Sequence, residues 1–210
     1  IEVALSDPEL KEDNCEVFSS ILNLQNHMER VVSSLLLLAR LDAGSEKVSF
    51  VDIPLVSYIK KAWKPFFDRA SKKQIKVSWE MVESDISILN DPDLFGILLS
   101  NLFDNAVSHI PESGMFNIKS IASNDGIKIV LSNTNPGVTS SDIAVIVSRF
   151  GRKKPDFDKS IGHSGIGFNI CERIVNDHLG GKMTVDVDNE WFTVTLEFPV
   201  EVIMGNHYHV

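Results

Sequence analysis

The spacing of apolar and polar positions divides the chain into two parts. Up to about residue 43, apolar residues recur in steps of three and four, which predicts a helix with one narrow apolar seam made of Ile21, Leu24, Met28, Val31, Leu35 and Leu38. Gly44 follows as a helix stop. A lone amphipathic helix cannot hide such a seam, so we expect it to pack on a partner subunit, with packing on the following domain as the alternative.

From residue 47 the pattern alternates between strands and helices. We expect strands over residues 47–52, 75–82, 115–122, 127–132, 183–187 and 191–198. We expect helices over residues 55–71, 91–109, 142–150 and 166–178. Asp91 can cap the second of these helices, with Pro92 in its first turn. Residues 123–126 have the chemistry of a hairpin turn. This order predicts an α+β fold, a two-layer α/β sandwich in which helices cover one face of a largely antiparallel sheet.

Composition narrows the class of protein. The chain of 210 residues is 43% hydrophobic, enough to bury a core, and its net charge of −9 argues against a nucleic-acid-binding surface. Cys15 and Cys171 follow no metal or disulfide spacing and indicate a reducing compartment. The longest apolar run, residues 35–39, is too short to cross a bilayer. The chain begins in mid-pattern without an initiator Met, which predicts a fragment of a longer protein.

Two polar clusters interrupt the structural pattern. Asn101 and Asn105 are four residues apart, so they share one helix face, where amide oxygens could bind a hard cation and amide protons a phosphate. Two surface asparagines are the simpler alternative. Residues 162–168 form a glycine-rich loop that leads directly into a helix, whose free N–H groups suit an anion. Taken alone, this loop could be turn chemistry only.

Together the two clusters resemble the histidine-kinase branch of the ATPase superfamily shared by gyrase, the heat-shock chaperone and mismatch-repair proteins. The matching segments are the N box (residues 91–106), the first glycine box (133–138), the phenylalanine box that opens the ATP lid (149–152), and the second glycine box with its helix (162–175). Their order and spacing agree across about residues 48–200. Residues 1–6 and 35–44 also resemble the end of the first helix and the second helix of the family's dimerisation bundle. The resemblance implies a Bergerat-type ATPase fold.

The resemblance also implies a site for ATP and Mg²⁺. Asn105 would bind Mg²⁺ through its side-chain oxygen, with Asn101 supporting the metal or the phosphates. Lid residue Arg152, with Lys153 or Lys154, would neutralise phosphate charge. The ATP-binding residues implied in this way are Asn101, Asn105, Ser108, His109, Asn133, Asn135, Gly137, Arg152, Lys153, Gly162, Ser164, Gly165, Ile166, Gly167 and Phe168. Of these, Gly165 and Gly167 would bring backbone amides to the phosphates, and Ile166 and Phe168 would either pack the domain or flank the nucleotide.

The residue at position 101 distinguishes phosphoryl transfer from ATP hydrolysis. The hydrolysing relatives carry a glutamate at this place, as the general base for water. An asparagine amide cannot take a proton, whereas phosphoryl transfer to an imidazole needs mainly positioning and charge stabilisation. The resemblance therefore implies a kinase, with a hydrolysing ATPase as the third hypothesis.

The sequence departs from the family pattern at several places. Asn133 replaces an aspartate that accepts a hydrogen bond from the adenine amino group, and its carbonyl accepts without charge assistance. Asn135 replaces a glycine, a change that we expect a left-handed backbone to accommodate. Ser108 and His109 stand where a basic residue and a tyrosine are common, which removes one phosphate or base contact. His163 replaces the first glycine of the second box.

We therefore expect the catalytic core of a sensor histidine kinase of a two-component system. Residues 1–46 would be part of the dimerisation domain, residues 47–200 the ATP-binding domain and residues 201–210 a tail. No acceptor-histidine box is present, so no catalytic residue is assigned. The expected partners are a second copy and a response-regulator receiver domain, in the cytoplasmic portion of an inner-membrane sensor whose membrane contacts lie outside this chain. The alternative is a degenerate, non-catalytic nucleotide-binding or dimerisation scaffold.

Overall fold

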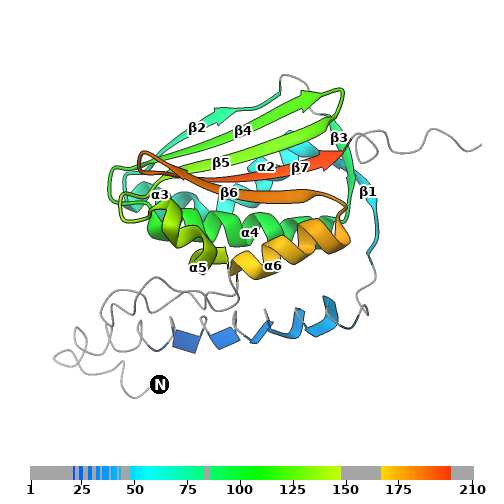
Figure 1. Ribbon diagram of the computed structural model, residues 1–210, viewed down its shortest axis with the longest axis horizontal. Coiled ribbons are helices and arrows are strands. Elements are labelled where there is room, and N and C mark those ends of the chain that lie inside the picture. Colours follow the sequence, from blue (N-terminus) through cyan, green and yellow to red (C-terminus); the bar gives the residue numbers. More distant parts are fainter. Residues whose placement is uncertain are drawn as a thin grey trace, which may run out of the picture.

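The computed structural model describes residues 48–82, 86–147 and 167–199, together with parts of an N-terminal helix (residues 21, 24, 25, 28, 29, 32, 33, 35–37, 39–41 and 43). The main body has two layers, a twisted sheet and a layer of helices against one of its faces (Figure 1). This is the predicted two-layer α+β architecture.

The main sheet has five strands in the order β2-β4-β5-β7-β6. Their bounds are Lys76–Glu80 (β2), Met115–Ser123 (β4), Gly126–Thr134 (β5), Lys182–Asp188 (β6) and Trp191–Pro199 (β7). Only the β2–β4 pair is parallel, so the sheet is largely antiparallel as predicted. The hairpin between β4 and β5 turns through Asn124 and Asp125, with Ser123 paired to Gly126.

The helical layer follows the predicted order, with one helix interrupted. Its elements are Leu55–Trp63 (α2), Lys64–Phe66 (η2), Phe67–Lys72 (α3), Pro92–His109 (α4), Ser140–Asp142 (η3), Ile143–Val147 (α5), Gly167–Arg173 (α6) and the π-helical turn Ile174–His178 (η4). The predicted helix over 55–71 is interrupted, because Pro65 lacks the N–H that a continuous helix needs and a 3₁₀ turn takes its place. The predicted strand over 47–52 is displaced, since β1 runs from Val51 to Pro54.

A second, two-stranded sheet pairs β1 with β3 (Ser87–Asn90). The sequence pattern did not predict β3, which is only four residues long and gives a weak alternation signal. The strand leads into Asp91, whose Oδ1 accepts hydrogen bonds from the backbone N–H of Asp93 (3.0 Å) and Leu94 (2.9 Å). The predicted helix cap is confirmed, and it fixes where α4 begins.

The central helix α4 contributes many of the buried side chains of the core. Its inward-facing side chains are buried against the sheet and the neighbouring helices; they are Leu94, Phe95, Leu98, Leu99, Leu102, Phe103, Ala106 and Val107. The ring of Phe103 meets Trp63 of α2 at 5.2 Å and Phe116 of β4 at 6.0 Å between centroids, in edge-on geometry. This packing leaves the opposite face of α4 for polar residues.

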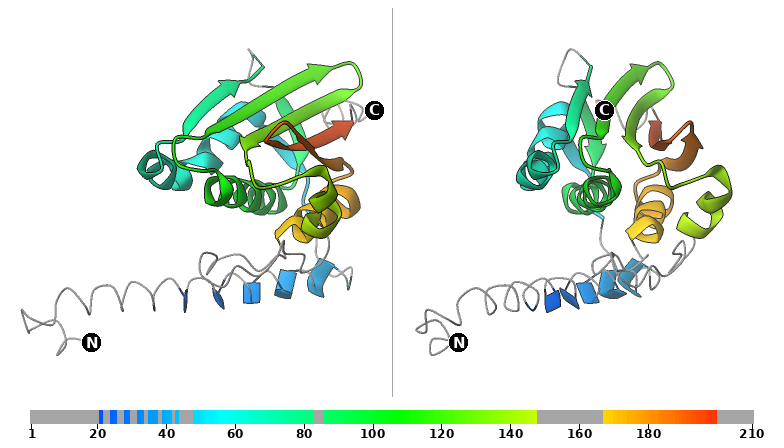
Figure 2. Two further views of the ribbon diagram at one scale, coloured as in Figure 1. Left: turned by 60° about the vertical axis from the view of Figure 1, so that its left-hand side comes forward. Right: turned by 90° about the vertical axis from the view of Figure 1, so that its left-hand side faces the viewer.

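The N-terminal helix presents two different faces. Its described seam residues Ile21, Leu24, Met28 and Leu35 are 43–59% exposed, whereas Leu41 is 4% exposed and joins the core. Leu37 also packs against that core. Because successive residues turn by about 100°, the positions of Leu37 and Leu41 lie across the helix from the seam. The helix therefore touches the domain with one face and leaves the seam open, on the side of the helical layer away from the sheet (Figure 2). Seam residues Val31 and Leu38 lie outside the described residues.

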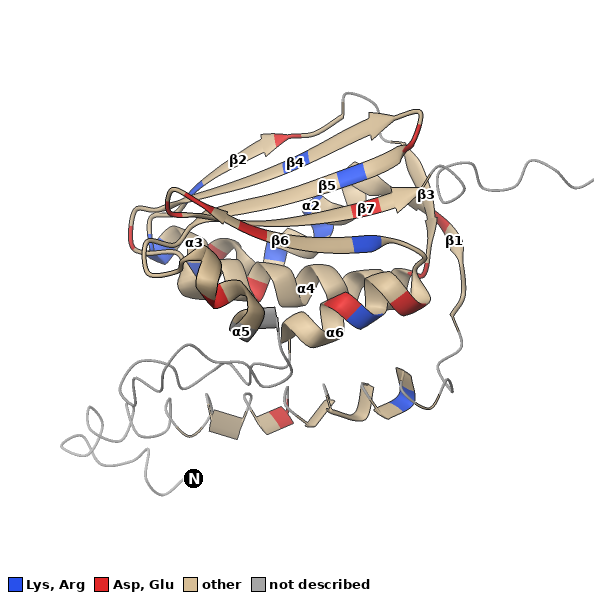
Figure 3. Ribbon diagram, in the orientation of Figure 1, with Lys and Arg blue, Asp and Glu red and all other residues tan. Residues whose placement is uncertain are grey.

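Two surface properties complete the description. Lys and Arg are interspersed with Asp and Glu over the helices and strands (Figure 3). Among the described residues, no helix combines the length and the apolar character that crossing a membrane requires.

Candidate functional site

The two asparagines of α4 differ in how they are held. The side-chain nitrogen of Asn101 donates to the carbonyl of Ile97 at 2.8 Å, one turn back along the helix. This bond leaves Oδ1 as the outward-facing atom of the amide. The side chain of Asn105 is half-buried and makes no hydrogen bond within the part of the chain that the structure describes. The helix face therefore offers amide oxygens, which are ligands that Mg²⁺ accepts.

The start of α6 lies directly against Asn101. A Cβ atom added to Gly167 would stand 3.3 Å from Oδ1 of Asn101, closer than an ordinary van der Waals contact. One turn further on, the thiol of Cys171 points at the carbonyl of Leu98 at 3.8 Å. Two clusters that are more than sixty residues apart in the sequence thus meet at one place, and the glycine makes that approach possible.

Asn133 lies on the strand next to the one that α6 contacts. It is 4% exposed and lies on β5, paired with Phe116 of β4 on one side and Phe192 of β7 on the other. Its side-chain nitrogen donates to the carbonyl of Thr134 at 3.2 Å, so its oxygen is the group available to accept a hydrogen bond. The ring of Phe168 in α6 packs edge-on against Phe192 at 5.6 Å between centroids. Phe168 is nearly buried, which fits the packing alternative for this residue.

The first glycine box differs from expectation at Asn135. The residues with positive φ in the described part are Gln74, Ser113, Asn189 and Glu190 among non-glycines, so Asn135 does not adopt the left-handed backbone that we predicted. Its N–H instead donates to the carbonyl of Glu190 at 2.7 Å, and its carbonyl accepts from Val138 at 3.2 Å. These bonds hold a turn that an asparagine enters without strain. A Cβ on Gly137 would meet nothing within 4 Å.

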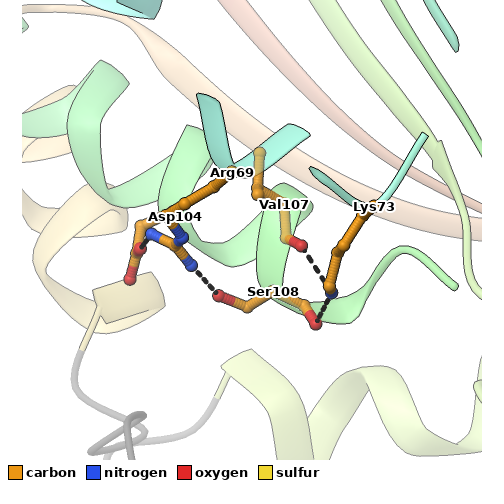
Figure 4. A network of polar contacts seen from close by, with 5 residues as sticks. All are labelled: Arg69, Lys73, Asp104, Val107 and Ser108. Atoms are coloured by element: carbon orange, nitrogen blue, oxygen red, sulfur yellow. Dashed lines mark hydrogen bonds and ion pairs between the residues drawn. The ribbon is translucent and has the colours of Figure 1, made fainter. Parts of the chain in front are cut away.

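The carboxyl end of α4 carries Ser108 and His109. His109 is exposed, and Ser108 is part of a polar network with two cations, Arg69 of α3 and Lys73 directly after α3 (Figure 4). Arg69 donates to Oγ of Ser108 at 2.9 Å and to Oδ1 of Asp104 at 2.5 Å. Sequence reasoning missed the contacts of Arg69 and Lys73, because each lies more than thirty positions from the residues that it contacts and no local motif connects them.

The remaining predicted site residues lie outside the described residues. They are Arg152, Lys153, Lys154, Gly162, His163, Ser164, Gly165 and Ile166. Among the residues that the structure does describe, no group of three or more His, Cys, Asp or Glu side chains could hold a metal ion.

Cys171 is a core residue, as the sequence suggested. It is 1% exposed, and burial raises the pKa of its thiol far above the ordinary value. A thiol that stays protonated is a poor nucleophile, so Cys171 takes no chemical part in the site.

Comparison with known families identifies the class of protein that this fold and site define. Residues 90–202, more than half of the chain, match the family described as "Histidine kinase-, DNA gyrase B-, and HSP90-like ATPase". The chain belongs to this family. The match begins one residue before the cap of α4 and takes in α4, β5 and α6, but not Arg69 and Lys73.

Individual relatives show which members of this family the chain is similar to. The chain is 23% identical over 174 residues to "Signal transduction histidine-protein kinase BaeS" of Escherichia coli strain K12, an alignment that covers 83% of this chain and 37% of BaeS. The chain thus spans well under half the length of that curated relative. Its fold is similar to full-length ShkA in complex with AMPPNP (TM-score 0.70, 24% identity, 82% of this chain and 36% of ShkA). It is also similar to histidine kinase ThkA in complex with response regulator protein TrrA (TM-score 0.68, 20% identity, 92% of this chain and 52% of ThkA).

Proposed function

We propose that this chain is the catalytic core of a sensor histidine kinase that binds Mg-ATP between α4 and α6. The observation that carries the proposal is the meeting of Asn101 with Gly167, with Asn133 on the strand next to the one that α6 contacts through Phe168. The contact brings a helix face that offers amide oxygens to a metal next to a helix start suited to phosphate. Asn133 adds a buried acceptor for an adenine amino group. The γ-phosphoryl group would pass to a histidine of the dimerisation domain and from there to an aspartate of a response regulator.

Each residue has a definite role in this proposal. Asn105 would hold Mg²⁺ through its side-chain oxygen, and Asn101 would support the metal or the phosphates. When bound, Mg²⁺ neutralises charge on the phosphates during transfer. Asn133 accepts from the adenine amino group without charge assistance, which makes this bond weaker than one to an aspartate. The backbone N–H of Gly167 lies at the start of α6, where an anion is stabilised.

Transfer is favoured over hydrolysis by the chemistry of α4. Asn101 holds a carbonyl of its own helix with its amide nitrogen and presents only an oxygen, which cannot accept a proton from water. No general base for water is therefore assigned on this face. Transfer to an incoming imidazole needs the acceptor to be positioned and the phosphate charge to be stabilised, both of which this arrangement could provide.

The assembly follows from the open seam and from the relatives. We expect Leu24, Met28 and Leu35 to meet the same residues of a second copy in a helical bundle. ThkA forms a complex with its response regulator TrrA, which supports a receiver domain as a second partner. We place the chain in the cytoplasmic portion of a sensor that would reach the membrane through other segments.

A second candidate function is a nucleotide-binding or dimerisation scaffold that has lost transfer. Two observations favour it: Asn133 removes the charge at the adenine position, and Ser108 removes a cation from α4. Such a protein would still self-associate through the seam, but it would not phosphorylate a histidine.

A trans-phosphorylation assay separates the two. The chain is mixed with a longer form of the protein that carries the acceptor helix together with Asn105→Ala, and γ-labelled ATP is added. A kinase would place acid-labile label on the longer form. The control has Asn105→Ala in both chains and should stay unlabelled. Absence of label with two chains that bind each other would favour the scaffold.

A further inference from the structure

Two cations, Arg69 of α3 and Lys73 directly after α3, approach the carboxyl end of α4, and they are used differently (Figure 4). Nζ of Lys73 donates to three backbone carbonyls there, those of Val107 (2.8 Å), Ser108 (2.9 Å) and Ile110 (3.1 Å). An ammonium group has three protons, so all its donors serve to cap the helix. Burial and the positive charge of Arg69 lower the pKa of Lys73. Lys73 is a structural cation.

Arg69 uses only part of its hydrogen-bond donors in these contacts. Its guanidinium has five N–H donors, of which one goes to Asp104 and one to Oγ of Ser108. The side chain is 48% exposed, against 20% for Asp104. An exposed ion pair of this kind contributes little to stability. Its effect is to hold a planar, permanently charged guanidinium in one orientation, while its other N–H donors make no hydrogen bond among the described residues.

The guanidinium of Arg69 lies close to the polar face of α4 that carries the proposed site. Asn101, Asn105 and Ser108 are spaced four and three residues apart, so they form one stripe on α4. Ser108 lies about 4.5 Å along the helix axis from Asn105, at 1.5 Å per residue. The guanidinium bonded to Ser108 therefore stands at the end of the stripe that begins where Gly167 meets Asn101.

We propose that Arg69 of α3 is a phosphate-binding residue of the nucleotide site, which supplies from a second helix the positive charge that Ser108 does not. The inference rests on the proposed function, since it needs a nucleotide on the α4 face. Ser108 and Asp104 position the guanidinium, and its remaining N–H groups donate to phosphate oxygens of the nucleotide. A cation carried by α3 also makes affinity depend on how α3 packs against α4.

The test is calorimetric titration of the chain with a non-hydrolysable ATP analogue and Mg²⁺. Arg69→Ala should weaken binding by about tenfold, the loss expected for one charge-assisted hydrogen bond. The matched control is Lys72→Ala, which removes an exposed cation from the same helix and should bind as wild type. The decisive variant is Arg69→Ala combined with Ser108→Lys, which returns a cation to the stripe from α4 and should recover most of the affinity.

The outcomes separate this inference from the proposed function. Wild-type affinity in Arg69→Ala would overturn the inference. A loss that Ser108→Lys does not recover would also overturn it, and would make Arg69 a structural link between α3 and α4; a lower thermal midpoint would accompany that result. If Asn105→Ala abolishes binding while Arg69→Ala leaves it intact, the proposed site stands and only the role of Arg69 falls. If wild type binds no nucleotide, both fall.

Discussion

Gly167 and Asn101 lie so close that a methyl group on the glycine would stand 3.3 Å from Oδ1 of the asparagine. Asn101 cannot easily turn away, because its amide nitrogen is bonded to the carbonyl of Ile97. The contact sets the distance between the start of α6 and the polar face of α4. It links the two clusters that carry the proposed chemistry.

Gly167→Ala should therefore push α6 away from α4. We expect the free energy of unfolding to fall by about 1 kcal/mol, a typical cost of overpacking, and the affinity for an ATP analogue to fall with it. Chemical denaturation and calorimetry measure the two effects. In an Asn101→Ala background the added methyl group has room, so Gly167→Ala should then cost much less stability. An equal cost in both backgrounds would contradict the contact.

Asp91→Ala should destabilise the domain by about 2 kcal/mol, at the upper end for a helix cap. The reason is that Asp91 also accepts from the N–H of Ser49 through Oδ2 at 2.6 Å, so two segments lose a partner. Asp93→Asn is the matched control, because it removes the same charge from the first turn of α4 while the cap stays in place. Its cost should stay below about 1 kcal/mol in denaturant titration.

Cys171 gives a prediction for alkaline pH. Burial raises the pKa of the Cys171 thiol in the folded state. The protonated thiol therefore contributes fully to stability below pH 9.0, the ordinary pKa of a thiol, and this contribution is lost as the pH rises above 9.0. The unfolded chain then releases a proton that the folded chain keeps. Between pH 8 and pH 10, wild type should lose about 1 kcal/mol more stability than Cys171→Ala. Identical pH profiles would show that the thiol is not shielded.

The open seam predicts self-association. Met28 is 59% exposed on the described face of the N-terminal helix, and a charge there would be buried in a bundle. Met28→Glu should shift sedimentation toward the monomer. Ser33→Glu lies on the side of the helix opposite Leu24, so it should leave the association unchanged. A wild-type chain that stays monomeric at high concentration would contradict a bundle built on this seam.

The order of elements could be predicted because their signals are local. Alternation in the sheet, the Asp91-Pro92 start of α4 and the turn at Asn124-Asp125 depend on neighbouring residues, and each is found in the structure. The local signals failed where they were short or where proline intervened. The four-residue β3 was missed, and Pro65 divides a helix that periodicity alone predicts as continuous.

The site could be predicted only in part. Asn101 and Asn105 share a face by spacing alone, but the approach of Gly167 depends on how α6 packs against α4, which no spacing gives. Arg69 shows the same limit, because its contact with Ser108 joins positions 39 apart and follows no motif. At Asn135 the expected backbone was wrong, since the bond to Glu190 comes from the neighbouring β-hairpin.

The proposed nucleotide site on α4 depends on Mg²⁺. Calorimetric titration of the chain and of Asn105→Ala with a non-hydrolysable ATP analogue, each with and without Mg²⁺, decides whether this site exists. We expect wild type to bind in a Mg²⁺-dependent manner and Asn105→Ala to lose this dependence together with most of the affinity. Absence of binding by wild type, or equal Mg²⁺-dependent binding by both proteins, would contradict it.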